Sequence, residues 1–169
     1  MKVLESERLA LRRLTGEDAA FILELVNEPS WIRFIGDRDV HDLDDARRYL
    51  EKGPIAMYDR LGFSLYLAEL KDTGTPIGIC GLIKRDSLPD VDLGFAFLPR
   101  FWGKGYARES AAAVLAYGRD TLGLSRIVAI TSPDNDSSIR LLESIGFSLE
   151  RTLTLAGETE ETRLYANHP

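Results

Sequence analysis

The spacing of apolar residues predicts a short strand and then a helix at the start of the chain. Leu9 and Leu11 are two residues apart and are flanked by Arg8 on one side and by Arg12 and Arg13 on the other, which is typical of a strand that ends near Leu14. Thr15 is a suitable helix cap with an acidic residue three positions later. The apolar residues of 21–26 then recur with helical spacing, so the first helix should cover this segment.

A second helix and a hairpin follow the first helix. Asp42 is the predicted start of the second helix, and Gly53-Pro54 should break or kink it. We expect the segment 29–40 between the two helices to be a loop. The alternating segment 63–69 and the apolar segment 77–83 flank a turn rich in Thr, Gly and Pro, and this pattern predicts a hairpin.

The second half of the chain alternates between strands and helices. The expected elements are a strand at 91–98, an alanine-rich helix to about 122, a buried strand at 127–131, a helix that ends at Gly146, and a final hairpin of 147–155 and 162–165. This order predicts one α/β domain over 1–169, with a mixed sheet and helices on both faces.

Composition and charge narrow the function classes. The chain has 169 residues, is 44% hydrophobic and 28% charged, and has a net charge of −6, which disfavours a general nucleic-acid binder. We expect no membrane span, because no apolar run approaches 18 residues. A single cysteine, Cys80, fits a reducing, cytoplasmic location, and His41 and His168 are too isolated to suggest a metal site.

The segment 100–107, Arg-Phe-Trp-Gly-Lys-Gly-Tyr-Ala, lies between a predicted strand and a predicted helix. Its two glycines allow a tight turn, and the unpaired amides of the first helical turn form an anion site. Arg100, Lys104 and Arg108 add positive charge, so a diphosphate is the natural ligand. A dinucleotide fingerprint and a Walker loop are both excluded by the spacing. The glycines alone fit a turn without a ligand equally well.

Two motifs carry a resemblance to a known family. Arg100-x-x-Gly103-x-Gly105-x-Ala107 resembles the Q/R-x-x-G-x-G/A signature of the GNAT superfamily of N-acetyltransferases. The helix from Asn135 to Gly146-Phe147 resembles the second motif of that family. The chain looks most similar to the ribosomal-protein N-terminal acetyltransferase (RimJ/RimL-like) branch. The resemblance covers roughly 4–165 and is tightest over 76–147.

The resemblance implies a GNAT fold with a mixed, mostly antiparallel sheet that is splayed between strands 4 and 5. It implies an acceptor-binding half at 1–75 and an acetyl-CoA-binding core at 76–166, with acetyl-CoA as cosubstrate and no metal. The coenzyme residues that it implies are Ala96, Phe97, Leu98, Arg100, Trp102, Gly103, Lys104, Gly105, Tyr106, Ala107, Arg108 and Asn135. Arg108 is alternatively an ordinary solvated helix residue, and Asn135 is alternatively, or in addition, a helix cap.

Two further residues have an implied chemical role. The attacking amine must lose a proton, and Asp92 is the candidate base where many relatives carry glutamate. The shorter aspartate suggests a proton relay through water, and Asp90 is the weaker alternative. Ser138 matches the residue that is thought to protonate or stabilise the leaving thiolate. Both residues also fit structural roles, as a strand-end acid and a helix-turn cap.

The acceptor site should come from the first two helices, the segment 29–40 between them and the loop 84–89. Trp31, Phe34 and Ile35 form either an apolar wall or part of the core, and Asp37 and Asp39 are placed to attract a cation. The acceptor is then a protein N-terminal α-amine, or alternatively a small metabolite or antibiotic amine. A non-catalytic acetyl-CoA-binding module is a third possibility. We expect a monomer or a homodimer.

Overall fold

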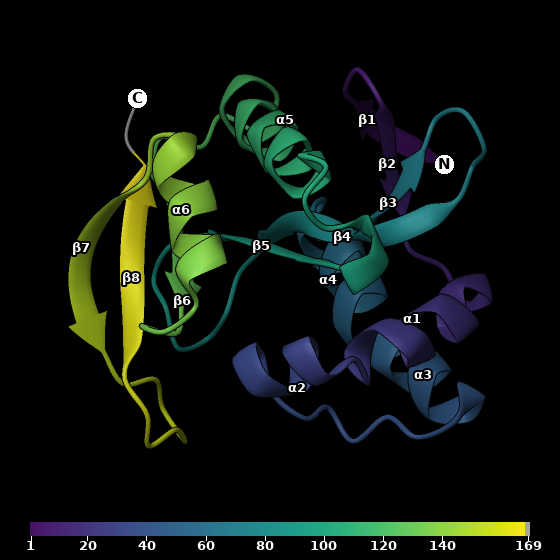
Figure 1. Ribbon diagram of the computed structural model, residues 1–169, viewed down its shortest axis with the longest axis horizontal. Coiled ribbons are helices and arrows are strands. Elements are labelled where there is room, and N and C mark those ends of the chain that lie inside the picture. The colour runs from purple at the N-terminus through teal and green to yellow at the C-terminus, as the bar shows by residue number, and fades with distance from the viewer. Residues whose placement is uncertain (168–169) are drawn as a thin grey trace.

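The computed structural model describes residues 1–167, which form a single eight-stranded sheet flanked by helices (Figure 1). The strands are β1 (Lys2–Glu5), β2 (Leu9–Arg13), β3 (Leu65–Leu70), β4 (Pro76–Ile83), β5 (Asp92–Phe97), β6 (Ile127–Thr131), β7 (Ser148–Leu153) and β8 (Thr162–Asn167). The α-helices are α1 (Ala19–Val26), α2 (Pro29–Phe34), α3 (Leu43–Leu50), α4 (Ala56–Leu61), α5 (Tyr106–Asp120) and α6 (Asp136–Ser144).

The strand order is β1-β2-β3-β4-β5-β6-β8-β7, and every neighbouring pair except β5 and β6 is antiparallel. β5 and β6 run parallel and are paired at one position only, Asp92 opposite Val128. The expected splay is therefore present. It lies where it was predicted, between the strands at 92–97 and 127–131. These strands are β5 and β6 rather than strands 4 and 5, because the sequence analysis did not count β1, a short strand with no fully buried residue.

Helices cover both faces of the sheet. α5 packs against β4 and β5, and its buried Ala111 and Val114 share a hydrophobic cluster with Tyr66 and Cys80. On the other face, α1, α2 and α3 bury their apolar side chains against Leu67, among other strand residues. Tyr66 and Leu67 are neighbours in β3 and lie in different clusters, as expected when successive side chains of a strand point to opposite faces.

The expected helix starts are present. Thr15 forms a capping box with Asp18 at a 3₁₀ turn that leads into α1, and the Asp42 side chain accepts a hydrogen bond from the Asp45 amide at the start of α3. The chain does not break at Gly53-Pro54. It passes through a π-helical turn, Glu51–Ile55, and continues as α4, so the proline produces an irregular turn within a longer helical segment.

The segment 29–40 was expected to be a loop, and that prediction was wrong over its first half. Pro29 begins α2, where a proline is well tolerated because its missing N–H would have no partner in the first turn. The buried indole of Trp31 attaches this helix to the cluster around α1 and α3. The remainder of the segment, before Asp42, is irregular.

No helix in the described part of the chain is long and apolar enough to cross a membrane. Among the same residues, no three His, Cys, Asp or Glu side chains gather as metal ligands would. His168 lies outside the described residues.

Candidate active site

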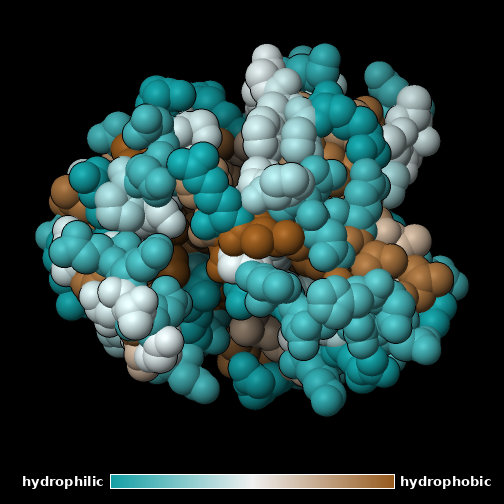
Figure 2. All heavy atoms as spheres, turned by 60° about the horizontal axis from the view of Figure 1, so that its bottom comes forward, coloured by the Kyte–Doolittle hydropathy of each residue, from teal (hydrophilic) through white to brown (hydrophobic). Residues whose placement is uncertain are grey.

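A cavity of about 800 Å³ lies where β5 and β6 part. Its walls come from the β5 edge, the segment 101–108 and the start of α6 on one side. On the other side they come from α2, Tyr49 of α3 and the π-helical turn. Figure 2 shows the hollow between the lobe of β6–β8 with α6 and the lobe of helices α1–α4, with hydrophobic residues along its floor.

The edge of β5 next to the gap is formed by alternate residues. The Leu98 amide donates to the Ile77 carbonyl of β4 (3.0 Å), so the amides of Leu98 and Ala96 face β4, and that of Phe97 faces the gap. The expected ligand contact at Leu98 therefore does not hold, because the residue is fully buried and its N–H is already bonded. Ala96 lines the cavity without offering its amide.

Phe97 is held in place by two neighbours. The indole N–H of Trp102 donates to its carbonyl (2.8 Å), which leaves the Phe97 amide as the free group at this point of the edge. A side chain at Gly78 would lie 2.5 Å from the Phe97 ring and 2.6 Å from the Ala96 carbonyl oxygen. Glycine at this position of β4 thus lets the β5 backbone and the Phe97 ring approach closely.

The segment 103–108 presents free amides at the cavity. None of its N–H groups donates to a backbone acceptor in the described residues, since the first such bond of α5 runs from Glu109 to Gly105. Gly103 (φ +75°) and Gly105 (φ +82°) take left-handed conformations that favour glycine. The start of a fifteen-residue helix adds a positive dipole end. This arrangement fits an anion such as a diphosphate.

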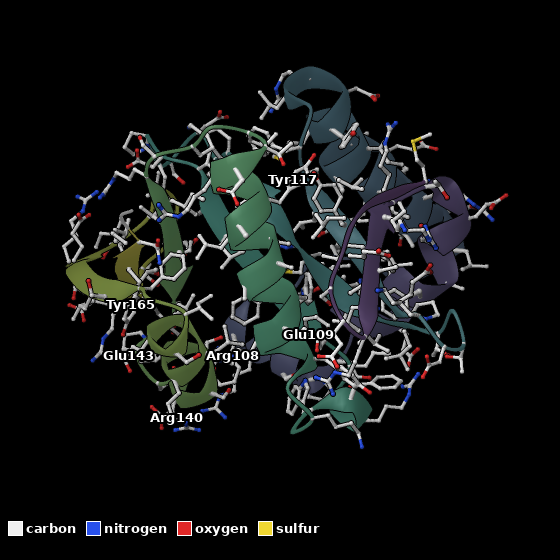
Figure 3. The ribbon with its side chains drawn as sticks, turned by 90° about the horizontal axis from the view of Figure 1, so that it is seen from above. Arg108, Glu109, Tyr117, Arg140, Glu143 and Tyr165 are labelled. Atoms are coloured by element: carbon white, nitrogen blue, oxygen red, sulfur yellow. The ribbon has the colours of Figure 1, made fainter. Side chains whose placement is uncertain are left out.

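The three cations predicted near this segment do not all reach the cavity. Arg108 lines it and also donates from α5 to the Ser144 hydroxyl (3.1 Å) and carbonyl oxygen (3.4 Å) at the end of α6, so it is more than a solvated helix residue (Figure 3). Arg100 does not line the cavity, and its guanidinium pairs with Glu24 of α1 (2.8 Å), so the structure does not support its predicted coenzyme contact. Lys104 is exposed and does not line the cavity.

A cluster at the N-terminal strands, which the sequence analysis did not identify, braces the glycine segment. The Glu109 carboxylate of α5 accepts hydrogen bonds from Ser6 and from the Arg8 backbone and side chain (Figure 3). The Arg8 guanidinium lies over the Tyr106 ring, 4.4 Å from its centre, and its Nη2 is 3.3 Å from where a Cβ at Gly105 would be. From the sequence alone, Arg8 is recognisable only as a polar residue that flanks a predicted strand, so its contact with the glycine segment could not be predicted.

The start of α6 supplies two of the predicted residues. The Asn135 side-chain oxygen caps the helix by accepting from the Ser138 amide (3.3 Å), so the capping role is confirmed. The Asn135 amino group has no hydrogen-bond partner in the described residues and is available to a ligand. The Ser138 hydroxyl likewise makes no hydrogen bond to any described residue, and both side chains line the cavity.

Asp92 lies at the fork where β5 leaves β6. The residue is 1% exposed, and its carboxylate accepts hydrogen bonds from Arg85 Nε (3.0 Å) and Nη2 (3.5 Å). Burial raises the pKa of Asp92, and the Arg85 charge opposes that rise. The alternative base, Asp90, pairs with Arg126 outside the cavity (2.9 Å).

The predicted apolar wall is present at the other end of the cavity. Trp31, Phe34 and Ile35 all line it, and Trp31 also belongs to the core, so the two interpretations hold together for this residue. Asp37 and Asp39 are exposed and do not line the cavity, so they offer it no carboxylate. Three polar residues of this wall were not named as candidates: Arg38 and Arg85, which lie in the predicted segments 29–40 and 84–89, and Tyr49 of α3.

The single thiol is not part of the site. Cys80 is fully buried within β4, and burial raises the pKa of its thiol to about 12, although a hydrogen bond with Ser110 opposes the rise. A thiol with this pKa is protonated at neutral pH and is a poor nucleophile.

Comparison with known proteins identifies the family of this chain. Residues 8–148 match the family model for the acetyltransferase (GNAT) domain. The chain belongs to the GNAT acetyltransferase family. It is 30% identical over 152 residues to the uncharacterized N-acetyltransferase YoaA of Bacillus subtilis, covering 89% of this chain and 85% of that protein. It is 22% identical over 158 residues to the spermidine N(1)-acetyltransferase of Escherichia coli, covering 85% and 74%.

Solved structures share this fold over the whole chain. The acetyltransferase from Agrobacterium tumefaciens superposes with a TM-score of 0.85 at 27% identity, covering 100% of this chain and 95% of that one. RimL, the ribosomal L7/L12 alpha-N-protein acetyltransferase, in complex with coenzyme A, gives a TM-score of 0.84 at 19% identity, covering 99% and 98%. This GNAT chain is therefore an N-acetyltransferase.

Proposed function

We propose that this acetyltransferase moves the acetyl group of acetyl-CoA directly to a primary amine while both substrates occupy the cavity. The observation that best supports this is the single pairing position between β5 and β6. β5 runs from Asp92 at the fork to Phe97 beside the glycine segment, so a ligand that spans both ends follows the free strand edge.

The residues around the cavity fit acetyl-CoA. The free amides of 103–108 suit its diphosphate, and Arg108 adds a charge at the same end. The Phe97 amide and the unpartnered Asn135 amino group suit the amide groups of its pantetheine arm. Acetyl-CoA supplies the activated thioester, and the protein positions that thioester and handles the protons.

In the proposed step, a C–N bond forms between the amine and the acetyl carbon, and the C–S bond breaks. Asp92 accepts the proton that the ammonium group must lose. A carboxylate that is 1% exposed and bonded to Arg85 has little room for direct contact, so we propose a relay through water. The nitrogen loses its second proton as the amide forms and the leaving sulfur takes up one proton, so that the products are the amide and the thiol of coenzyme A. The Ser138 hydroxyl, which has no partner among the described residues, donates a hydrogen bond to that sulfur as its negative charge develops.

Binding of the coenzyme is tested with a matched pair of glycine variants. Coenzyme A should bind one per chain by calorimetry and raise the melting temperature. Gly105→Val should abolish both signals, because a side chain there is strained at φ +82° and approaches Arg8 beside the free amides. Gly74→Val is the control: it has a similar φ of +72°, lies in the β3–β4 turn outside the cavity, and should keep the ligand-induced shift.

Turnover is tested by thiol release from acetyl-CoA in the presence of primary amines. Release that depends on the amine supports direct transfer, whereas coenzyme binding without release from any amine would support a non-catalytic module. The similar proteins do not indicate which amine this chain acetylates, because their names give different acceptors. One relative is named for spermidine, and a structural neighbour is named for a protein N-terminus. The walls of the cavity are more informative.

A further inference from the structure

The charge of the cavity wall is opposite to that of the whole molecule. The chain has a net charge of −6. The ionisable Asp, Glu, Lys and Arg side chains that line the cavity are nevertheless four arginines and two aspartates: Arg38, Arg85, Arg108, Arg140, Asp92 and Asp136. Arg108 lies at the coenzyme end, and Arg140 and Asp136 lie on α6. Arg38, Arg85 and Asp92 remain at the acceptor end.

Three donors gather at the acceptor end. Arg38 makes no hydrogen bond or ion pair to any described residue. Arg85 donates to Asp92 from Nε and Nη2 only, and its side chain is 33% exposed. Tyr49 lies near both arginines: burial raises the pKa of its hydroxyl, and the charges of Arg38 and Arg85 act against that rise. All three line the cavity.

The same wall has no free carboxylate among the described residues. The Asp92 carboxylate is bonded to Arg85, and Asp37 and Asp39, the neighbours of Arg38 in sequence, do not line the cavity. Trp31 contributes one more donor, because its buried indole N–H has no partner among the described residues. A wall of unsatisfied donors is complementary to a group that only accepts, and an ionised carboxylate is such a group.

We infer that the acceptor is a primary amine that bears a carboxylate near its nitrogen and an apolar body, and that Arg38 and Arg85 bind the carboxylate. The inference rests on the proposed acetyl transfer and names its acceptor class. Trp31, Phe34 and Met57 line the same end and suit the apolar body. A planar guanidinium pairs with a carboxylate through two parallel hydrogen bonds, which fixes the orientation of the ligand as well as binding it.

A polyamine makes the opposite demand. Each of its additional ammonium groups is best matched by a carboxylate, and the only carboxylate of the described wall at this end is Asp92, which Arg85 already neutralises. Spermidine should therefore be a poor acceptor here, although a 22% identical relative is named for it.

The test compares acceptors that differ in the carboxylate alone. Thiol release is measured with phenylalanine, phenylalaninamide and phenethylamine, and with spermidine. The values of kcat/KM are expressed per concentration of neutral amine, because these amines titrate differently. The value of kcat/KM for phenylalanine should exceed those for phenylalaninamide and phenethylamine, which lack the carboxylate, by at least about 10-fold. One charge-assisted hydrogen bond supplies a difference of this size. Equal values for the three, together with equal values for the Glu and Gln peptides described next, would overturn the inference and leave the proposed transfer intact.

A peptide arm separates two sources of the carboxylate. A short C-terminally amidated peptide that begins with Glu carries the group on a side chain, and the peptide that begins with Gln lacks it. A preference for Glu over Gln that exceeds the preference for phenylalanine over its amide would assign the carboxylate to an acidic protein N-terminus. The reverse result would assign it to a free amino acid. Both results support the inferred chemistry.

Variants locate the effect on Arg38. Arg38→Gln should reduce the ratio of kcat/KM for phenylalanine over phenethylamine to near 1, mainly through KM. Arg47→Gln is the control, because Arg47 is another exposed arginine that pairs with Asp44 on α3 and does not line the cavity. A ratio that is unchanged in Arg38→Gln, or that falls equally in Arg47→Gln, would contradict the assignment.

A binding measurement covers the case of very slow turnover. With coenzyme A bound, N-acetylphenylalanine should raise the melting temperature more than N-acetylphenethylamine does, and Arg38→Gln should remove the difference. If these product analogues give equal shifts and the rates show no preference, the inferred acceptor class is wrong. If coenzyme A itself gives no shift and no amine releases thiol, the proposed function is wrong instead.

Discussion

Asp92→Asn tests the base assignment with little change in shape. The substitution keeps the volume of the side chain at the fork of β5 and β6 and removes its capacity to accept a proton. Two effects on stability oppose each other. The variant loses the ion pair with Arg85, but it also avoids the cost of ionising a residue that is 1% exposed. We therefore expect the melting temperature and the coenzyme A shift to stay close to those of the wild type.

The rate should respond strongly. A positioned general base contributes about 100-fold or more, so kcat at pH 7 should fall by that order. An alkylamine with a pKa near that of lysine is neutral in roughly one molecule in 2,500 at pH 7, and this fraction grows about 100-fold by pH 9. Without a base the reaction depends on that fraction, so the variant should recover most of its activity as the pH rises.

The activity of the wild type should fall at acidic pH, where Asp92 becomes protonated and can no longer accept a proton. Burial holds the pKa of Asp92 above its ordinary value of 3.8. Activity should therefore decline, as the pH falls, at a pH above that value. For stability the sign is also fixed: a raised pKa in the folded state favours folding below the unfolded pKa, and this contribution is lost as the pH rises through the folded pKa. The Asn variant should lack both dependences.

The assay is thiol release at saturating acetyl-CoA, with kcat measured from pH 6 to 9 for the wild type and for Asp92→Asn. Asp90→Asn is the matched control, because Asp90 precedes the same strand and pairs with Arg126 outside the cavity. If Asp92→Asn kept the wild-type kcat across this range with a good amine, the base assignment would be refuted. A loss of the coenzyme A shift in Asp92→Asn would instead indicate a structural role.

Two further variants address the other side of the step. Ser138→Ala should lower kcat by less than Asp92→Asn does, and by a factor that varies little with pH, since its hydroxyl has no structural partner among the described residues; a pH-dependent loss measured in the same assay would contradict the thiolate role. Cys80→Ala should keep turnover, because the thiol is buried and its pKa is raised to about 12. An acetyl adduct on Cys80 seen by mass spectrometry would show a covalent route.

The sequence predicted the fold well where local signals were strong. The capping residues Thr15 and Asp42 and the glycine at 146 marked helix ends that the structure confirms, and Gly146 has a φ of +100°. Two elements were missed for physical reasons. β1 has little apolar patterning because most of its residues are not fully buried, and α2 is a six-residue helix whose stability comes from the packing of Trp31.

The corrections at the candidate site have a common cause. Sequence spacing placed Leu98 and Arg100 next to the glycine segment, and it could not show which way each group points. The direction depends on the register of β5 with β4, which turns the Leu98 amide toward Ile77, and on the position of α1, which brings Glu24 to Arg100. Both are long-range contacts.

The two ends of the cavity are built differently, and this explains why only the coenzyme end can be recognised from a motif in the sequence. The coenzyme end uses backbone amides and left-handed glycines within one short segment, so the chemistry requires particular residues at fixed spacing. The acceptor end joins Arg38, Tyr49 and Arg85 from three separate segments, and only the fold brings them together. An exposed side chain at that end, such as Arg38, can change without disturbing the sheet or the glycine segment. On the inferred assignment, we expect the acceptor preference of this chain to depend on those three segments. Arg38 is exposed and has no partner among the described residues, so we expect its substitution to alter that preference at the least cost to the fold.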